Sequence, residues 1–198
     1  MKITEIRTHV LQAALSQPFC YSRAWYDTRT AMVVEIATDS GLTGWGECYG
    51  PARMTAAVVA GIAPWLIGSD PLRTEHLWRE VYARLRDHGQ KGVVIQGLSG
   101  IDIALWDIKG RHFGVPVHTL LGGPVRSAVQ AYATGLYRRR SGDPQKYLAE
   151  GRRLCRRGLQ GREAEGRLWR RGGCRGDPRG ARRDRPRRRP DGRCEPRL

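Results

Sequence analysis

The sequence lacks the features of a membrane, secreted or metal-cluster protein. No apolar run approaches the roughly 20 residues that a membrane-spanning helix needs, and the start M-K-I-T-E-I has no signal-peptide pattern. None of the five cysteines forms a C-x-x-C pair, so neither a zinc site nor a redox motif is indicated. We therefore expect free thiols, a cytoplasmic location and no membrane partner.

Positive charge is abundant but unevenly distributed. The formal net charge is +16, which alone would suggest a nucleic-acid or anionic-surface partner. Residues 151–198 hold 18 Arg, no Lys and 6 acidic residues, a net charge of +12. The first 150 residues therefore carry only +4, as an ordinary soluble domain does.

Residues 151–198 also lack every Val, Ile, Phe, Tyr, Met and Lys. Such a segment cannot bury enough apolar surface to offset the ordering of its backbone, so its composition predicts a disordered basic tail. A functional interpretation is an Arg-rich arm that binds nucleic acid non-specifically. A third interpretation is an out-of-frame translation of a GC-rich gene, because the change after Glu150 is abrupt.

The most ordered pattern lies between residues 93 and 116. Apolar residues recur there at three- and four-residue steps, which predicts one buried helix face: Leu98, Ile101, Leu105 and Ile108. We expect Ser99 to cap a helix of about four turns, with Asp102 in the capping-box position, although the helix could begin as early as Val93. Gly114 and Pro116 are expected to end it.

Two motifs carry a resemblance to a known family. I-D-I-A-L-W-D-I-K-G at 101–110, followed by G-V-P-V-H-T-L-L-G-G at 114–123, resembles the signature helix and turn of the mandelate racemase/muconate lactonizing branch of the enolase superfamily. G-W-G-E at 44–47 resembles the same family. The resemblance implies an α+β fold: an N-terminal capping domain, built as an antiparallel meander followed by helices, and then a (β/α) barrel.

The rest of the first 150 residues fits that order. We predict strands at 3–11, 30–38 and 42–49, the last two joined by a turn at 39–41. Helices are expected at 55–66, bent or ended near Pro64, and at 72–87. Alternation at 129–137 fits a first barrel strand, and 144–150 the start of the first barrel helix. The expected organisation is a capping domain at 1–125, the start of a truncated barrel at 126–150, and the tail at 151–198.

Candidate substrate-binding residues lie in two predicted loops. Residues 12–29 show no consistent period and form an aromatic, basic loop; a second loop spans about 49–53. In the family that the chain resembles, such loops close over the active site and help to select the substrate. The candidates are therefore Tyr21, Arg23, Trp25, Tyr26 and Tyr49, although aromatic residues of this kind can also simply cover a small core.

The resemblance also implies a chemistry for a full-length parent. That family removes the proton α to a carboxylate with a Lys or His base, and Mg²⁺ stabilises the enediolate. We expect a hydroxy acid or acid sugar as substrate, dehydration as the reaction, and a homo-oligomeric parent, with racemase, epimerase and cycloisomerase activities as alternatives. We assign no catalytic and no metal-binding residue to this chain, because it contains no K-x-K motif and no series of metal-ligating acids.

Shifting the reading frame by one base makes the tail compatible with that family. Residues 162–174 then permit G-K-L-K-V-G-F-G-V-E-E-D, and 190–198 permit L-M-V-D-A-N-H-A. These strings resemble the second barrel strand with its K-x-K and the third strand with its metal-binding Asp. One hypothesis is thus a capping domain truncated by a frame slip and inactive on its own. The alternative is a small α+β domain with a genuine Arg-rich, nucleic-acid-binding tail.

Overall fold

The structure is a computed structural model that describes residues 1–21, 24–139, 144–156 and 160–164. Contacts divide these residues into two units, which are described separately. The first unit contains Met1–Ser16 and Asp27–Ala128; the second contains Gln17–Tyr26 and the residues from Val129 on. Among the described residues, no helix combines the length and the apolarity that crossing a membrane requires.

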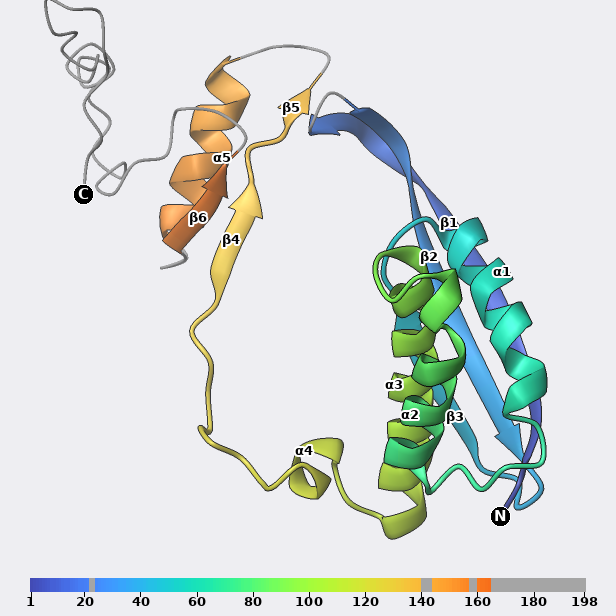
Figure 1. Cartoon of the computed structure of the whole chain (residues 1–198). Helices are drawn as coiled ribbons and strands as arrows, with labels where there is room; N and C mark the ends of the chain where they lie inside the picture. The colour runs from blue at the N-terminus through green and yellow to red at the C-terminus, as the bar shows by residue number, and fades with distance from the viewer. Residues whose placement is uncertain (22–23, 140–143, 157–159, 165–198) are drawn as a thin grey trace, which may run out of the picture. The chain divides into compact units, whose positions relative to one another are not determined.

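The first unit is an antiparallel sheet with helices on one face (Figure 1). Its strands are β1 (Ile3–Tyr21), β2 (Ala24–Thr38) and β3 (Thr43–Cys48), with β2 between the other two. Its helices are α1 (Ala52–Ile62), α2 (Thr74–Arg84), α3 (Val93–Phe113) and the short α4 (Val117–Leu120), with 3-10 turns η1 (Ala63–Trp65) and η2 (Arg86–His88). This arrangement confirms the predicted α+β capping-domain fold.

The core lies between the sheet and α3. Every second residue of β2 is buried from Met32 to Thr38, which places Met32, Val34 and Ile36 against the helices. The predicted apolar face of α3 is buried as expected: Leu98, Ile101, Leu105 and Ile108 are all at most 2% exposed. Helix α2 adds Leu77, Val81 and Leu85 to the same core.

Strand β3 and helix α3 approach so closely that neither tolerates a side chain between them. A Cβ placed on Gly44 would lie 2.2 Å from the carbonyl oxygen of Ala104, and one on Gly46 would lie 2.0 Å from that of Gly100. On the helix side, a Cβ on Gly100 would lie 2.2 Å from Cys48 Sγ. The glycines of G-W-G-E thus serve close packing, while Trp45 between them points away and is 43% exposed.

A carboxylate secures the same contact. Asp107 Oδ2 on α3 accepts hydrogen bonds from the backbone N–H of Trp45 at 3.0 Å and from Arg111 Nε at 2.9 Å. Lys109 Nζ donates to Thr74 Oγ1 at 3.3 Å and lies 4.9 Å from the centre of the Trp106 ring. Two polar residues of the signature helix therefore have structural contacts within the first unit.

Three local predictions about this unit are corrected. Helix α3 starts at Val93, which confirms the early start expected from the sequence. Ser99 therefore lies inside the helix, where its Oγ donates to the carbonyl of Ile95 at 2.8 Å, and neither Ser99 nor Asp102 caps the helix. The predicted end of α3 is confirmed, since Gly114 follows Phe113 as the C-cap with a left-handed φ of +66°. Helix α1 ends at Ile62, near Pro64 as predicted. It starts at Ala52, earlier than the predicted start at residue 55.

The predicted loop at 12–29 is wrong. Strands β1 and β2 continue through this region as a long two-stranded hairpin, interrupted in the described chain only at 22–23. Residues 11–14 are all exposed. Because this ribbon has no face buried throughout, no alternation of apolar and polar residues marks it in the sequence.

The second unit contains a β-α-β element. Strand β4 (Tyr132–Gly135) and strand β6 (Gln160–Ala164) pair in parallel, and helix α5 (Pro144–Arg156) lies between them in sequence. A further two-residue strand, β5 (Arg138–Arg139), pairs with the end of β1. Beyond residue 150, helix α5 continues to Arg156 and the parallel strand β6 follows at Gln160–Ala164. The remainder of the tail, 165–198, lies outside the described residues, and the predicted domain boundaries stay predictions.

The glycine contacts predict opposite effects for two Gly→Ala substitutions. Gly46→Ala forces a methyl group against backbone atoms, 2.0 Å from Gly100 O and 2.8 Å from Ala104 N, so we expect a loss of about 3 kcal/mol in the free energy of unfolding. Gly61→Ala, at an exposed position of α1 with open space around it, should gain about 0.5–1 kcal/mol from helix propensity. Urea denaturation followed by far-UV circular dichroism measures both. An unchanged midpoint for Gly46→Ala would refute the close packing.

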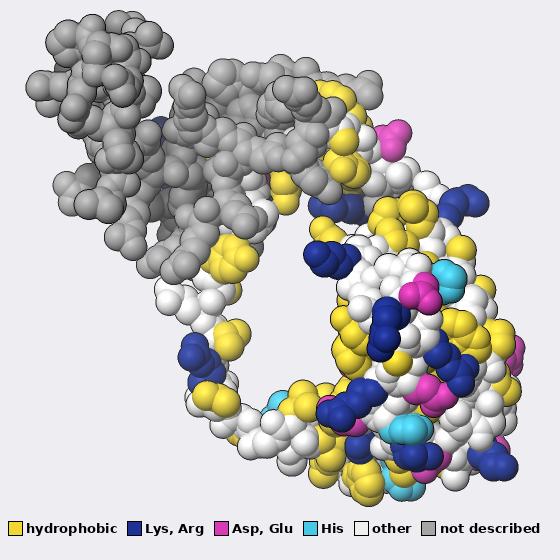
Figure 2. All heavy atoms as spheres, viewed as in Figure 1, with side chains coloured by type: hydrophobic (Ala, Val, Ile, Leu, Met, Phe, Trp, Pro, Cys, Tyr) yellow, Lys and Arg dark blue, Asp and Glu magenta, His cyan; other side chains and the backbone are white. Residues whose placement is uncertain are grey.

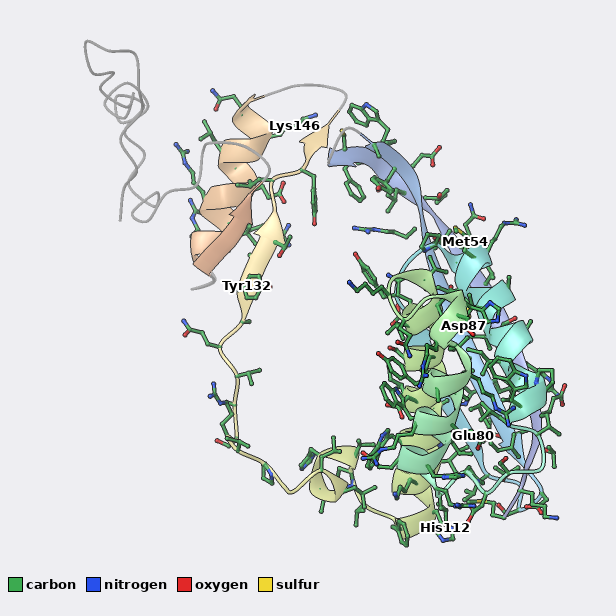
Figure 3. All side chains as sticks on the ribbon, viewed as in Figure 1. Met54, Glu80, Asp87, His112, Tyr132 and Lys146 are labelled. Carbon is green, nitrogen blue, oxygen red and sulfur yellow. The ribbon has the colours of Figure 1, made fainter. Side chains whose placement is uncertain are left out.

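Asp102 predicts a pH-dependent effect. Burial between α2 and α3 raises the pKa of this carboxyl, and the nearby carboxylate of Glu75 raises it further. Folding therefore favours the protonated form, and stability falls as pH rises through the titration of Asp102. Asp102→Asn should increase the free energy of unfolding at neutral pH, and the gain should vanish in acid, where Asp102 is already protonated. Asp87→Asn, at an exposed position of η2 (Figure 3), is the charge-matched control, and an equal gain from it at neutral pH would contradict this assignment.

Candidate functional site

The loop after β3 presents Tyr49 to solvent. Tyr49 is 82% exposed, and Gly50 beside it has a φ of +106°, a conformation that favours glycine. A Cβ on Gly50 would lie 2.2 Å from Oε1 of Gln96, which is buried and without a hydrogen-bond partner among the described residues. The predicted candidate Tyr49 thus sits on a turn fixed by close packing, and sequence reasoning missed Gln96 beneath it.

Helix α1 begins directly after this turn. Pro51 precedes its first residue, and the carbonyl of Pro51 accepts hydrogen bonds from the backbone N–H groups of Met54 and Thr55, each at 3.0 Å. Met54, 56% exposed, lies at this N-terminal end of α1 (Figure 3). Tyr49 and Met54 therefore give this end of the first unit two exposed, largely apolar side chains.

The far end of the β1–β2 hairpin holds an aromatic cluster in the second unit. The Phe19 ring stacks on Tyr26, with centroids 5.5 Å apart and planes 20° apart, and lies 4.8 Å from the Tyr137 ring. Phe19 is 8% exposed, whereas Trp25 next to Tyr26 is 46% exposed. Backbone pairing of Phe19 with Arg139 and of Cys20 with Arg138 also attaches the end of β1 to β5.

This cluster lies where β4 ends. Tyr137 follows Leu136, whose φ of +60° is unusual for a residue with a side chain. The Leu136 N–H donates to Glu150 Oε1 on α5 at 3.4 Å, and a Cβ on Gly135 would come within 3.1 Å of the same oxygen. In (β/α) barrels the active site forms at the C-terminal ends of the strands. The hairpin end is thus held at the C-terminal end of a strand that has a parallel neighbour.

The predicted candidates fall in both units. Trp25 and Tyr26 are on β2 within the second unit, and Tyr49 is in the first. Tyr21 is the last residue of β1, and Arg23 lies outside the described residues. The structure adds Phe19 and Tyr137 to the neighbourhood of Tyr26. Tyr137 had no distinguishing pattern in the sequence, because an aromatic residue near a strand end is common.

The described residues do not supply a metal site. Among them no three His, Cys, Asp or Glu side chains come close enough together to hold an ion. The family's Mg²⁺ therefore does not fit the described part of this chain. Burial raises the pKa of the Cys48 thiol to about 11, since Cys48 lies between β3 and α3, so this buried thiol is poorly suited to act as a nucleophile or ligand.

An antiparallel meander covered by helices is the fold of a capping domain. Comparison with known proteins agrees: the model of the mandelate racemase/muconate lactonizing enzyme N-terminal domain matches residues 3–122. The chain belongs to this family, a branch of the enolase superfamily.

Individual relatives act on acid sugars or their lactones. The chain is 53% identical over 139 residues to a D-galactarolactone cycloisomerase of Agrobacterium fabrum, covering 70% of this chain and 37% of that protein. It is 46% identical over 103 residues to a D-galactonate dehydratase of Verminephrobacter eiseniae, covering 51% of this chain and 27% of that one. The chain thus spans between a quarter and two fifths of the length of these curated relatives.

Solved structures show the same fold. The 3,6-anhydro-D-galactonate cycloisomerase of Zobellia galactanivorans superposes with a TM-score of 0.70 at 35% identity, over 80% of this chain and 41% of that one. An enolase-superfamily member from Polaromonas superposes with a TM-score of 0.69 at 32% identity, over 80% of this chain and 42% of that one.

The aromatic cluster predicts a local dynamic effect. Tyr137→Leu removes a ring that packs on Phe19, and an aromatic pair contributes about 0.5–1.5 kcal/mol beyond its buried area. Backbone amides of Phe19 and Tyr26 should then exchange with solvent about 2- to 10-fold faster, as measured by hydrogen exchange. Tyr132→Leu, at a 56% exposed position of β4 (Figure 3), is the matched control and should leave both amides unchanged. Equal effects of both variants would contradict a specific role of the cluster.

Proposed function

We propose that residues 1–125 are the substrate-capping domain of an acid-sugar enzyme of this family, and that the residues after them begin its barrel. The observation that carries the proposal is the 53% identity to a D-galactarolactone cycloisomerase, which extends over 139 residues. Two features support it: the end of the β1–β2 hairpin, which is attached beside the end of β4, and the turn that exposes Tyr49. Segments of this kind can close over the mouth of a barrel. Dehydration of a sugar acid is the reaction we favour, with lactone cycloisomerisation as the closest alternative.

Each candidate residue has a role in this proposal. Tyr26, fixed by its stack on Phe19, would hold the hairpin in place, while Trp25 and Tyr49 expose ring surface that suits the apolar face of a sugar ring. Arg23 and Tyr26 would contact a carboxylate or hydroxyls, since a guanidinium pairs well with a carboxylate, and Tyr21 remains a further candidate. These residues would exclude water and orient the substrate, and would not themselves take the α proton.

Proton removal requires residues that this chain does not have. The family's base and Mg²⁺ ligands belong to later barrel strands, and the sequence holds no K-x-K motif. We therefore propose that the chain as given is inactive and that a frame slip near 149–152 separates it from its barrel. The parent enzyme would be Mg²⁺-dependent and homo-oligomeric.

The nucleic-acid alternative rests on the Arg-rich tail alone. On the visible face of the first unit, basic and acidic side chains are interspersed, without a continuous basic stripe (Figure 2). Duplex binding that weakens steeply with salt and is lost on deleting residues 151–198 would favour the alternative.

Restoring the frame tests the proposed function. Sequencing of the coding DNA across codons 145–165 should reveal one extra or missing base, and the corrected gene should encode K-L-K and V-D-A-N within a full barrel. The corrected protein with Mg²⁺ should convert D-galactonate or D-galactarolactone, whereas the chain as given should show no turnover above buffer. Turnover by the unchanged chain, or a confirmed sequence without a slip, would overturn the truncated-enzyme proposal.

A further inference from the structure

One edge of the first unit's sheet is paired over only part of its length by the residues that the structure describes. In the order β3-β2-β1-β5, strand β1 is paired on its outer side only by the two residues of β5, opposite Phe19 and Cys20. At its other end, Ile3 exchanges backbone hydrogen bonds with the Gly68–Ser69 loop, at 2.9 and 2.8 Å. Between these points, no strand of the described residues pairs with the outer edge of β1.

At residues 10–16, the sequence of this edge lacks the charge and the proline that protect many edge strands. Natural edge strands are shielded by charged side chains, proline, bulges or covering elements. Residues 10–16, V-L-Q-A-A-L-S, contain no charge and no proline. The neighbouring part of β1 is different: Arg7 forms ion pairs with Glu5 and with Glu35, and His9 Nε2 lies 2.7 Å from Glu35 Oε2. The uncharged run begins where this network ends.

The edge is also able to accept a strand. Strand β5 already pairs antiparallel with β1 a few residues further along the same side. The side chains of residues 10–14 are exposed, with Val10 at 43% and Leu11 at 55%, so a partner strand would meet apolar surface as well as backbone groups. Backbone pairing provides affinity in such strand addition, and side chains determine the register.

We propose that residues 10–16 pair antiparallel with the same residues of a second copy of this chain, across a twofold axis at Ala13. This register sets Leu11 of one copy opposite Leu15 of the other, and Gln12 opposite Ala14. The smallest side chain lies on the axis, and no charge meets another. The run is therefore self-complementary, as a twofold interface requires. This inference does not depend on the proposed enzymatic function.

Charge pairs on the axis test the register. Because the axis places residue 13 of each copy opposite its own equivalent, Ala13→Lys should bring two like charges together and weaken the dimer by up to about fivefold. Ala13→Glu should do the same. An equimolar mixture of the two variants should restore the dimer, because Lys then faces Glu. Sedimentation equilibrium of the full chain, at one fixed low ionic strength so that charges at position 13 are not screened, measures the dimerisation of Ala13→Lys, of Ala13→Glu and of their mixture.

A matched control and a local measurement complete the test. Ala60→Lys adds the same charge at an exposed position of α1 and should leave dimerisation unchanged. Hydrogen exchange on the wild-type chain should show that amides of residues 10–16 gain protection as protein concentration rises, and that Ala13→Lys abolishes the gain. A monomeric wild-type chain, an unaffected Ala13→Lys dimer, no restoration in the mixture, or concentration-independent exchange at 10–16 would each overturn the proposal.

Discussion

The first unit depends on the close approach of β3 to α3. Gly44 and Gly46 face Gly100 and Ala104 across distances that leave no room for a Cβ on either glycine of β3. Without this contact, Leu98, Ile101 and Ile108 of α3 could not pack against Met32, Val34 and Ile36 of β2. The core would then lose its close packing. Asp107 then binds the Trp45 N–H, so a single carboxylate fixes the helix along the strand. The two most recognisable motifs of the sequence are thus the two sides of one interface.

The helical part of this fold was readable from the sequence because its residues have one buried face. The spacing of Leu98, Ile101, Leu105 and Ile108 predicted α3, and Gly114 marked its end. Its start at Val93 was also expected from the sequence. The capping role of Ser99 was not correct, because its hydroxyl bonds to the Ile95 carbonyl inside the helix, and local capping preference alone could not show this.

The hairpin and the second unit were harder to read for a different reason. Residues 11–14 are exposed, so the β1 extension has no periodicity to detect. Strand β6 runs through Q-G-R-E-A, which contains no branched or aromatic residue, and is defined by pairing with β4 rather than by composition. For the candidate site, aromatic content identified Trp25, Tyr26 and Tyr49. It could not reveal that Tyr26 stacks on Phe19 across the hairpin, because the region was predicted as a loop. Nor could it reveal that Phe19 contacts Tyr137, because these residues lie more than 100 positions apart.

The bond between Trp45 and Asp107 spans 62 residues of sequence, which has a consequence for how the chain folds during synthesis. The sheet of the first unit cannot be covered until α3 has emerged from the ribosome, so the hairpin strands must wait with one apolar face exposed. Once Phe113 and the Gly114 cap have emerged, every element of that core is present. The first unit can therefore complete its folding before any barrel strand has been translated, and a ribosome that reads a wrong frame downstream would still release a chain with a folded first unit.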